Sequence, residues 1–239
     1  MTSTTLPPGS LPTPSTAPAP GAELLTSGRW LGVLMLLSFA LGILSNFALQ
    51  PLAWSQGGML ASAAAHGTAL GGAVLMDLML ALIGLTISLL LRQRYGSTQP
   101  LLTMFCLAFS VAELTLCLVE GSSLVAMRTL SASYLAHPAD ASAYAPVAAL
   151  LKALRNGFHY SGKAFGGLGL LLFFVQLSRA RALPLWFAGL LLSATALQIL
   201  TVALGFIGLD APLLMLAPLG LLYPFSALWL LWRGLPRRA

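Results

Sequence analysis

The stretch "FCLAFSVAELTLCLVEG", from Phe105 to Gly121, decides how this chain folds. It is almost entirely apolar, and as a helix rising 1.5 Å per residue it crosses most of a hydrocarbon core about 30 Å thick. Two carboxylates, Glu113 and Glu120, interrupt it. Charged side chains at such depth face other helices or a wet cavity rather than lipid. The stretch therefore predicts a transmembrane helix whose acidic face is turned inward.

The composition of the whole chain agrees with a membrane environment. Of its 239 residues, 58% are hydrophobic and 8% are charged, and the mean hydropathy is +0.88. A soluble domain carries about 25% charged residues. We therefore expect an integral membrane protein whose main partner is the lipid bilayer. The net charge of +6 does not indicate a nucleic-acid partner, because the basic residues are not clustered as a binding face.

Apolar runs of membrane length occur six times and predict an all-α membrane protein, a bundle of six transmembrane helices. The predicted spans are Trp30–Leu52, Gly67–Leu91, Leu101–Gly121, His159–Gln176, Leu183–Leu209 and Leu213–Trp232. The third helix is expected to continue toward Tyr134, and the fourth to begin near Pro146. Residues 29–234 form this domain. Residues 1–28, rich in Pro, Ser and Thr, predict a disordered cytoplasmic tail, and residues 235–239 a short basic cytoplasmic tail.

The distribution of arginine predicts the orientation of the bundle. Eight arginines lie on one side of the membrane if both termini are cytoplasmic: Arg29, Arg92, Arg94, Arg179, Arg181, Arg233, Arg237 and Arg238. The loops on the other side keep Arg128, together with Asp140 and Asp210. Because positive residues concentrate on the cytoplasmic side, the sequence predicts an N-in, C-in protein of a bacterial inner membrane.

Depth along the predicted helices brings several polar side chains to one level. Counted from the cytoplasmic end of each span, Glu113 lies about 18 Å up, Asp77 about 21 Å and Lys163 about 22 Å. Asn46 and Gln198 fall within a few ångströms of this level. Opposite charges buried at depth pair with each other or line a cavity. We therefore expect Glu113 to face Lys163, with Asp77 close by.

A second charged layer lies nearer the outer interface, where Glu120 and His159 are both about 28 Å up. One basic stripe follows the fourth span and consists of Lys152, Arg155, His159 and Lys163. Its height matches that of the acidic face of the third span. The predicted ligand-binding or proton site therefore comprises Asp77, Glu113, Lys163, His159, Glu120, Arg155, Asn46 and Gln198. No catalytic residue is assigned, and the absence of HExxH and CxxC motifs predicts neither a metal nor a cofactor.

Three functions remain open at this point. The first is binding or transport of a small polar or anionic solute, linked to a proton if one of the acids is protonated. The second is an intramembrane enzyme that acts on a lipid-linked substrate with a carboxylate as general base. The third is a structural or accessory subunit whose charges only hold helices together, although such polar contacts are worth about 0.6 kcal/mol on average. Ionisable groups at depth favour the first function.

Two segments resemble a known family of bacterial membrane proteins. The longer reads "RNGFHYSGKAFGGLGLLLFFVQLSRARALPLWFAGLLL", from Arg155 to Leu192, and the shorter reads "FSVAEL", from Phe109 to Leu114. The longer segment combines a histidine before a Phe-Gly-rich helix, a short basic loop, and the pair Pro184 and Trp186. In these features the chain resembles the domain of unknown function 4386 family over roughly Arg29 to Gly234. The resemblance implies a six-helix membrane protein and implies no established activity.

Overall fold

The computed structural model describes residues 20–55, 57–137, 141–209 and 212–236, and this part of the chain is built from helices and turns without a strand. Six of these helices are long and apolar enough to cross a membrane: Gly28–Trp54, Gly67–Tyr95, Pro100–Ala136, Ser142–Arg179, Leu185–Phe206 and Leu214–Arg233. Leucine and tryptophan side chains cover much of their outer surface, as lipid contact requires. The protein is a multi-pass integral membrane protein, which confirms the predicted fold class.

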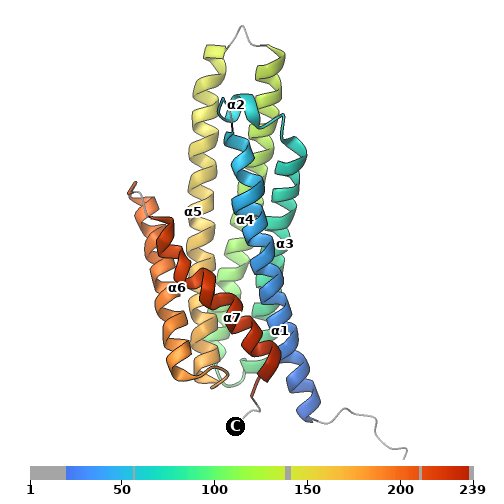
Figure 1. Ribbon diagram of the computed structural model, residues 1–239, viewed down its shortest axis with the longest axis vertical. Helices are drawn as coiled ribbons and strands as arrows, with labels where there is room; N and C mark the ends of the chain where they lie inside the picture. Colours follow the sequence, from blue (N-terminus) through green and yellow to red (C-terminus); the bar gives the residue numbers. More distant parts are fainter. Residues whose placement is uncertain (1–19, 56, 138–140, 210–211, 237–239) are drawn as a thin grey trace, which may run out of the picture.

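The helices follow one another as a chain of spans joined by short turns (Figure 1). In order they are α1 (Pro20–Ile43), the π-helical turn η1 (Leu44–Leu49), the 3₁₀ turn η2 (Gln50–Trp54), α2 (Met59–Ser62), α3 (Gly67–Tyr95), α4 (Pro100–Ala136), α5 (Ala141–Arg179), α6 (Leu185–Phe206), the 3₁₀ turn η4 (Leu213–Leu216) and α7 (Ala217–Arg233). Because η1 and η2 continue α1 without a break, the first span is one long irregular helix.

Two helices are longer than the predicted spans. α4 has 37 residues and α5 has 39, so each is almost twice as long as the roughly 30 Å hydrocarbon core. They pack along each other as an antiparallel hairpin that projects beyond the other helices (Figure 1). α4 continues past Gly121 as expected, whereas α5 begins at Ala141 and so places Pro146 inside the helix rather than near its start.

The first helix begins earlier than the sequence predicted. α1 begins at Pro20, so residues 20–28 of the predicted tail belong to a helix. Residues 1–19 lie outside the described part of the chain, and so do four charged residues used to predict orientation: Asp140, Asp210, Arg237 and Arg238.

The first and last spans meet at one end of the bundle, which we call the terminal end. A Cβ atom on Gly28 would lie within 2.6 Å of the backbone of Gly234. A Cβ on Gly32 would lie 2.6 Å from the carbonyl oxygen of Ala227. Two glycines four positions apart let α1 and α7 approach closely, as small residues do at membrane helix contacts. The opposite end, where α4 and α5 project, is the hairpin end.

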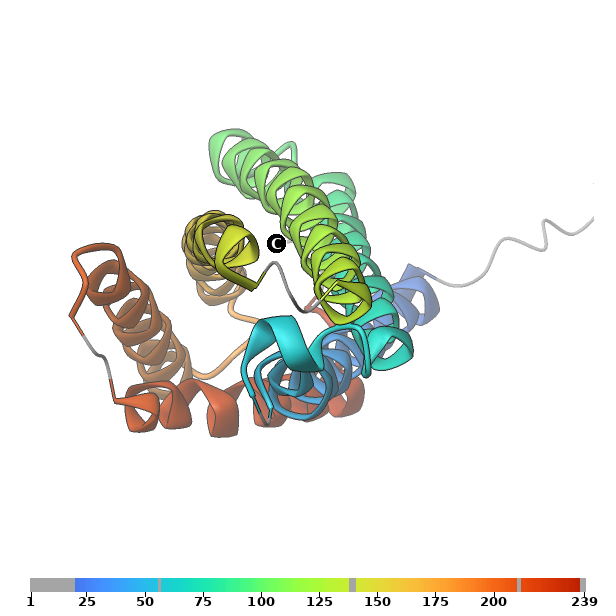
Figure 2. The same ribbon diagram turned by 90° about the horizontal axis from the view of Figure 1, so that it is seen from above.

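The contact between α1 and α7 does not continue to the hairpin end. Its last polar link is a hydrogen bond of 3.0 Å between the hydroxyls of Ser38 and Tyr223. Beyond this link α7 packs against α6, and the described part of the chain shows no extensive packing of η1 against α7. Seen from the hairpin end, α6 and α7 form a separate flank beside α5 and α1 (Figure 2).

Two apolar cores stabilise the bundle, one toward each end. The larger core lies toward the terminal end and includes Leu31, Leu91 and Phe174. The smaller core lies toward the hairpin end and includes Leu70, Leu124 and Met127. The segments of α3, α4 and α5 between these two cores carry the charged residues predicted as a site. The fold therefore places a polar layer between the two apolar cores.

Candidate functional site

The strongest charged contacts join α4 to α5. The carboxylate of Glu120 forms an ion pair with the guanidinium of Arg155, with the nearest N and O atoms 3.0 Å apart. It also contacts Nδ1 of His159 at 2.8 Å. The side chains of Arg155 and Glu120 are only 12% and 13% exposed, so neighbouring protein groups rather than solvent surround both charges. Glu120 and His159 thus lie at one height, as the depth count indicated.

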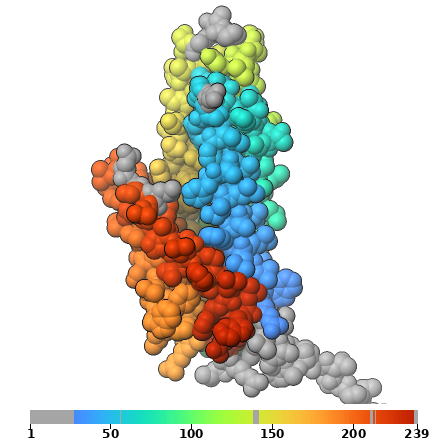
Figure 3. All heavy atoms as spheres, viewed as in Figure 1, coloured from blue at the N-terminus to red at the C-terminus, as the bar shows by residue number. Residues whose placement is uncertain are grey.

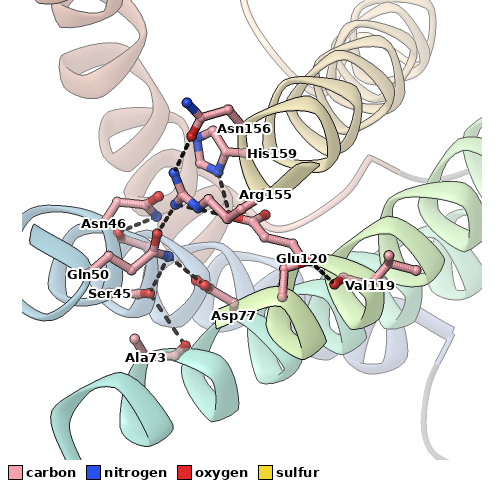
Figure 4. Close-up of polar contacts among 12 residues, drawn as sticks. Ser45, Asn46, Gln50, Ala73, Asp77, Val119, Glu120, Arg155, Asn156 and His159 are labelled. Carbon is pink, nitrogen blue, oxygen red and sulfur yellow. Dashed lines mark hydrogen bonds and ion pairs between the residues drawn. The ribbon is translucent and has the colours of Figure 1, made fainter. Parts of the chain in front are cut away.

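A glutamine connects this cluster to α3. The side-chain amide nitrogen of Gln50 donates to Asp77 at 2.7 Å, and its amide oxygen accepts a hydrogen bond from Arg155. A continuous chain of polar contacts therefore runs from Asp77 through Gln50 and Arg155 to Glu120 and His159, across four elements of the bundle (Figure 4).

The irregular end of the first span explains how Gln50 reaches this position. Pro51 has no backbone N–H, and its ring collides with the carbonyl four residues earlier, so an α-helix cannot continue through it. The chain instead forms the π-helical turn η1 and the 3₁₀ turn η2, which carry Ser45 and Gln50 as buried residues. Ser45 accepts a hydrogen bond of 3.2 Å from Gln50. π-helical turns occur frequently at functional sites.

Sequence reasoning missed Gln50. It lies inside the predicted first span, but it was not included in the polar layer. The signal that could have found it is the dipeptide Gln50-Pro51 within an apolar run, because a proline there predicts a distorted helix and an amide at depth needs partners. Trp54 was also missed, and the guanidinium of Arg155 lies 5.2 Å from the centre of its ring.

Glu113 and Lys163, which the sequence predicted to face each other, line the same cavity without forming a close ion pair. Within the described part of the chain, neither side chain forms an ion pair at 4.0 Å or less. The register of the two helices is the reason. The carboxylate of Glu113 packs against Gly166, where an added Cβ would collide with it, whereas Gly162 is level with Leu116. Lys163 therefore lies about one turn closer to the hairpin end than Glu113.

Both of these charged groups line a cavity. A small cavity of about 30 Å³ is enclosed by α3, α4, α5 and η1, and Asp77, Glu120, Glu113 and Lys163 all contribute to its wall. This volume has room for about two water molecules. We call it the inner cavity. Asp77 thus lies near Glu113 and Lys163, as expected, although its hydrogen bond goes to Gln50.

The inner cavity adjoins a much larger groove of about 1000 Å³ between α1, α5, α6 and α7. The two spaces share four polar wall residues, which are Asn46, Glu113, His159 and Lys163. In the space-filling view the surface is hollowed between α7 and α1, with α5 behind (Figure 3). We call this space the groove.

The two predicted amide residues lie on the groove. The side-chain nitrogen of Asn46 donates to the carbonyl of Gly42 at 2.9 Å. Gln198 of α6 lines the groove, and its side-chain oxygen is buried without a hydrogen-bond partner in the described part of the chain. The structure therefore brings the predicted residues into one continuous polar layer, with Glu113 and Lys163 at the junction of the two spaces.

The charges of this layer divide into a satisfied group and an available group. Glu120 is bound by Arg155 and His159, and Asp77 is bound by Gln50. Glu113 and Lys163 instead face the cavity. The satisfied group holds α3, α4, α5 and the first span together. The available pair faces the cavity, and ionisable groups at membrane depth are candidates for a functional site.

Comparison with known proteins gives one relationship. No curated protein and no solved structure matches the chain. A family model described as "Domain of unknown function (DUF4386)" matches residues 30–234, which is the entire six-helix region. The chain therefore belongs to this family, as the resemblance of its two segments implied.

Proposed function

We propose that the protein binds a small anionic solute inside the membrane, with Lys163 as the residue that holds the anion. The observation that supports this proposal most is the position of the Lys163 ammonium. It lines both the inner cavity and the groove, and within the described part of the chain it has no ion pair at 4.0 Å or less and no hydrogen bond. Its charge is offset only at longer range, by the carboxylates of Glu113, Asp77 and Glu120, and an ionisable group at membrane depth is a functional hypothesis by default.

Glu113 gives the proposed site a second property. Its carboxyl group faces the same cavity about one turn away from Lys163 and lacks an ion pair at 4.0 Å or less among the described residues. An anion that binds Lys163 therefore approaches a carboxyl group as well. Taking up a proton at Glu113 removes the repulsion between the two, so binding and any transport of the anion would be linked to a proton.

The test measures stabilisation of the purified full-length chain by small anions, with phosphate, acetate and chloride as probes. A ligand at ten times its dissociation constant stabilises the folded state by about 1.4 kcal/mol. We expect at least one anion to raise the apparent melting temperature of the wild type. The substitution Lys163→Met should abolish this effect. Lys152→Met is the matched control, because Lys152 is exposed on the same helix.

Two results would contradict the proposal. The first is a wild type that none of the anions stabilises. The second is a Lys163→Met variant that the anions stabilise as much as the wild type and the Lys152→Met control, because the anion would then bind elsewhere.

A further inference from the structure

The groove is far larger than a small anion needs. Its volume of about 1000 Å³ lies at the upper end of the range of about 300–1000 Å³ that holds drug-sized ligands. The charged end of the groove is formed by Asn46, Glu113, His159 and Lys163. An anion at Lys163 would occupy this end and leave the remainder unfilled.

Apolar side chains form most of the remaining wall. On the first span they include Phe39, Ile43 and Phe47, and on η4 and α7 they include Leu214, Leu216 and Leu219. A small polar solute gains nothing from such walls, whereas an alkyl chain gains about 0.8 kcal/mol for each methylene it buries from water. Glu113 lies about one turn further along the groove than Lys163, and beyond it the wall is mainly apolar. The groove therefore has a charged end, which includes Glu113, and an apolar body, which is the chemical pattern of an amphiphile.

The depth of Lys163 matches that of a lipid headgroup. α6 has 22 residues, a length of about 33 Å that fits the hydrocarbon core closely. Its last residue, Phe206, packs on Tyr160 with ring centres 6.0 Å apart. Lys163 follows Tyr160 by three residues, so it lies about 4.5 Å inside the hairpin-end boundary of the core. A lysine at that depth can extend its ammonium to the interface, where lipids place their anionic groups.

The length and direction of the groove also match a lipid chain. Along α5 the groove runs from His159 to Phe173, and the part from Lys163 to Phe173 extends toward the terminal end. Ten residues of helix cover about 15 Å, which is half of the hydrocarbon core and therefore the depth of one leaflet. An alkyl chain with its head at Lys163 would lie in the groove with the same direction as its neighbours in the bilayer.

The groove is open to the side, where lipid surrounds the protein. α1 and α7 are joined at Gly28 and Gly32 and by the Ser38–Tyr223 hydrogen bond, all at or below the middle of the bundle. Nearer the hairpin end, the described part of the chain shows no extensive packing of η1 on α7. At Gly220 of α7, an added Cβ would meet no atom within 4 Å. A chain can therefore enter between α1 and α7 without leaving the membrane.

From these features we infer that the natural ligand is a lipid-like amphiphile, whose anionic head binds Lys163 and whose alkyl chain fills the groove. This inference rests on the proposed function, since it needs an anion site at Lys163, and it adds the class of molecule that carries the anion. The head is a phosphate or a carboxylate, because the lysine ammonium recognises either as a point charge.

The test compares three probes on the full-length chain in a maltoside detergent: dodecyl phosphate, dodecanol and inorganic phosphate. Dodecanol has the chain without the charge, and phosphate has the charge without the chain. The apparent melting temperature is followed against the concentration of each probe. We expect dodecyl phosphate to half-saturate at a concentration about tenfold or more below that of phosphate, because each buried methylene adds to the binding free energy.

Two variants and two controls locate the probe. Lys163→Met should lower the affinity for dodecyl phosphate about tenfold or more, which is the loss expected for one hydrogen bond to a charged group. Gly220→Leu should weaken the binding of dodecyl phosphate but not that of inorganic phosphate. The added leucine side chain fills the apolar body of the groove and is compatible with a helix. Lys152→Met and Gly189→Leu should change neither, since Lys152 is exposed and Gly189 lies on the outer face of α6.

The possible results separate the two proposals. If dodecyl phosphate binds no better than phosphate and Gly220→Leu has no effect, while Lys163→Met abolishes both, the amphiphile inference is overturned and the anion site stands. If dodecanol binds as well as dodecyl phosphate, the head adds nothing and the amphiphile inference is overturned. If Lys163→Met changes the binding of neither dodecyl phosphate nor inorganic phosphate, no anion binds Lys163 and both proposals are overturned.

Discussion

The side-chain amide of Gln50 is the residue on which the polar layer depends. Its nitrogen donates to the carboxylate of Asp77 and its oxygen accepts from the guanidinium of Arg155. An amide carries a donor and an acceptor on one planar group, whereas a carboxylate only accepts and an ammonium only donates. Gln50 therefore joins an acid on α3 to a base on α5 and leaves neither of its own polar atoms unpaired.

Replacing Gln50 by leucine should destabilise the protein. The substitution leaves Asp77 without its amide donor and removes one acceptor from Arg155, and an unsatisfied buried polar group costs about 1–3 kcal/mol. Gln176→Leu is the matched control. Gln176 is fully buried on α5, and among the described residues its amide contacts only the thiol of Cys106, a weak hydrogen-bonding group. Its replacement should be neutral or stabilising.

The measurement is the apparent melting temperature of both variants and the wild type in the same detergent. A Gln50→Leu protein as stable as the wild type would show that the chain of polar contacts through Gln50 adds nothing to the stability of the fold. A strong loss in both variants would show instead that any leucine at a buried glutamine harms this fold, whatever the partners of the amide.

For single residues, the sequence predicted the depth of a side chain in the bundle better than it predicted which side chains are in contact. The rise of a helix is fixed at 1.5 Å per residue, so Glu120 and His159 could be assigned to one level, and they are in contact. Contact also depends on the register between helices, and a shift of one turn is enough to separate Glu113 from Lys163. Gly166 sets that register, because its missing side chain leaves the space that the Glu113 carboxylate occupies. Nothing in the sequence alone ranks this contact above its alternatives.

Among the helices, the contact between α1 and α7, which we call the seam, determines the shape of the groove. The helices touch through Gly28 and Gly32 at the terminal end and separate beyond Ser38 and Tyr223. A seam along the whole length of both helices would close the space between them. The groove is therefore a consequence of where the small residues of α1 lie.

The substitution Gly32→Leu should weaken the seam. Its Cβ would lie 2.6 Å from the carbonyl oxygen of Ala227, and overpacking of this kind typically costs about 1–3 kcal/mol. Gly189→Leu serves as the control, because a Cβ at Gly189 meets no atom within 4 Å. We expect a lower apparent melting temperature for Gly32→Leu only. Equal stability of the two variants would mean that α7 can move away from α1 without cost.

The number of helices was predictable because a bilayer imposes both a length and an apolar surface on each span. Their ends were harder to predict. The outer halves of α4 and α5 lie beyond the apolar runs, in segments such as residues 141–157 that carry Lys152 and Arg155. There the helix is held by packing between the two long helices rather than by lipid, and hydropathy does not report such packing. The distortion at η1 was missed for a related reason, since it arises from Pro51 and its polar partners.

For the molecule as a whole, the orientation in the membrane is a prediction from charge. The terminal end carries Arg29, Arg92, Arg94, Arg179, Arg181 and Arg233, whereas the projecting parts of α4 and α5 carry Arg128 and Lys152. By the positive-inside rule the terminal end should be cytoplasmic. The hairpin of α4 and α5 would then project from the outer face of a bacterial inner membrane.

Cysteine labelling tests this orientation. In a background with Cys106 and Cys117 replaced by alanine, single cysteines are introduced as Lys152→Cys and Arg181→Cys, both at exposed positions. A membrane-impermeant maleimide should label Lys152→Cys in intact spheroplasts and Arg181→Cys only after permeabilisation. The opposite pattern would reverse the orientation, and labelling of both variants in intact spheroplasts would contradict a single orientation.

The closure of the bundle by α1 and α7 also has a consequence for biosynthesis. α1 enters the membrane before every other span described here, yet the surface of Gly28 and Gly32 meets its partner only when α7 has been synthesised. Until then the intermediate spans have to hold α1 through the contacts of Ser45 and Gln50 with α3. The polar layer would thus guide assembly of the nascent chain before it serves any ligand, and the last helix to be made completes the wall of the groove.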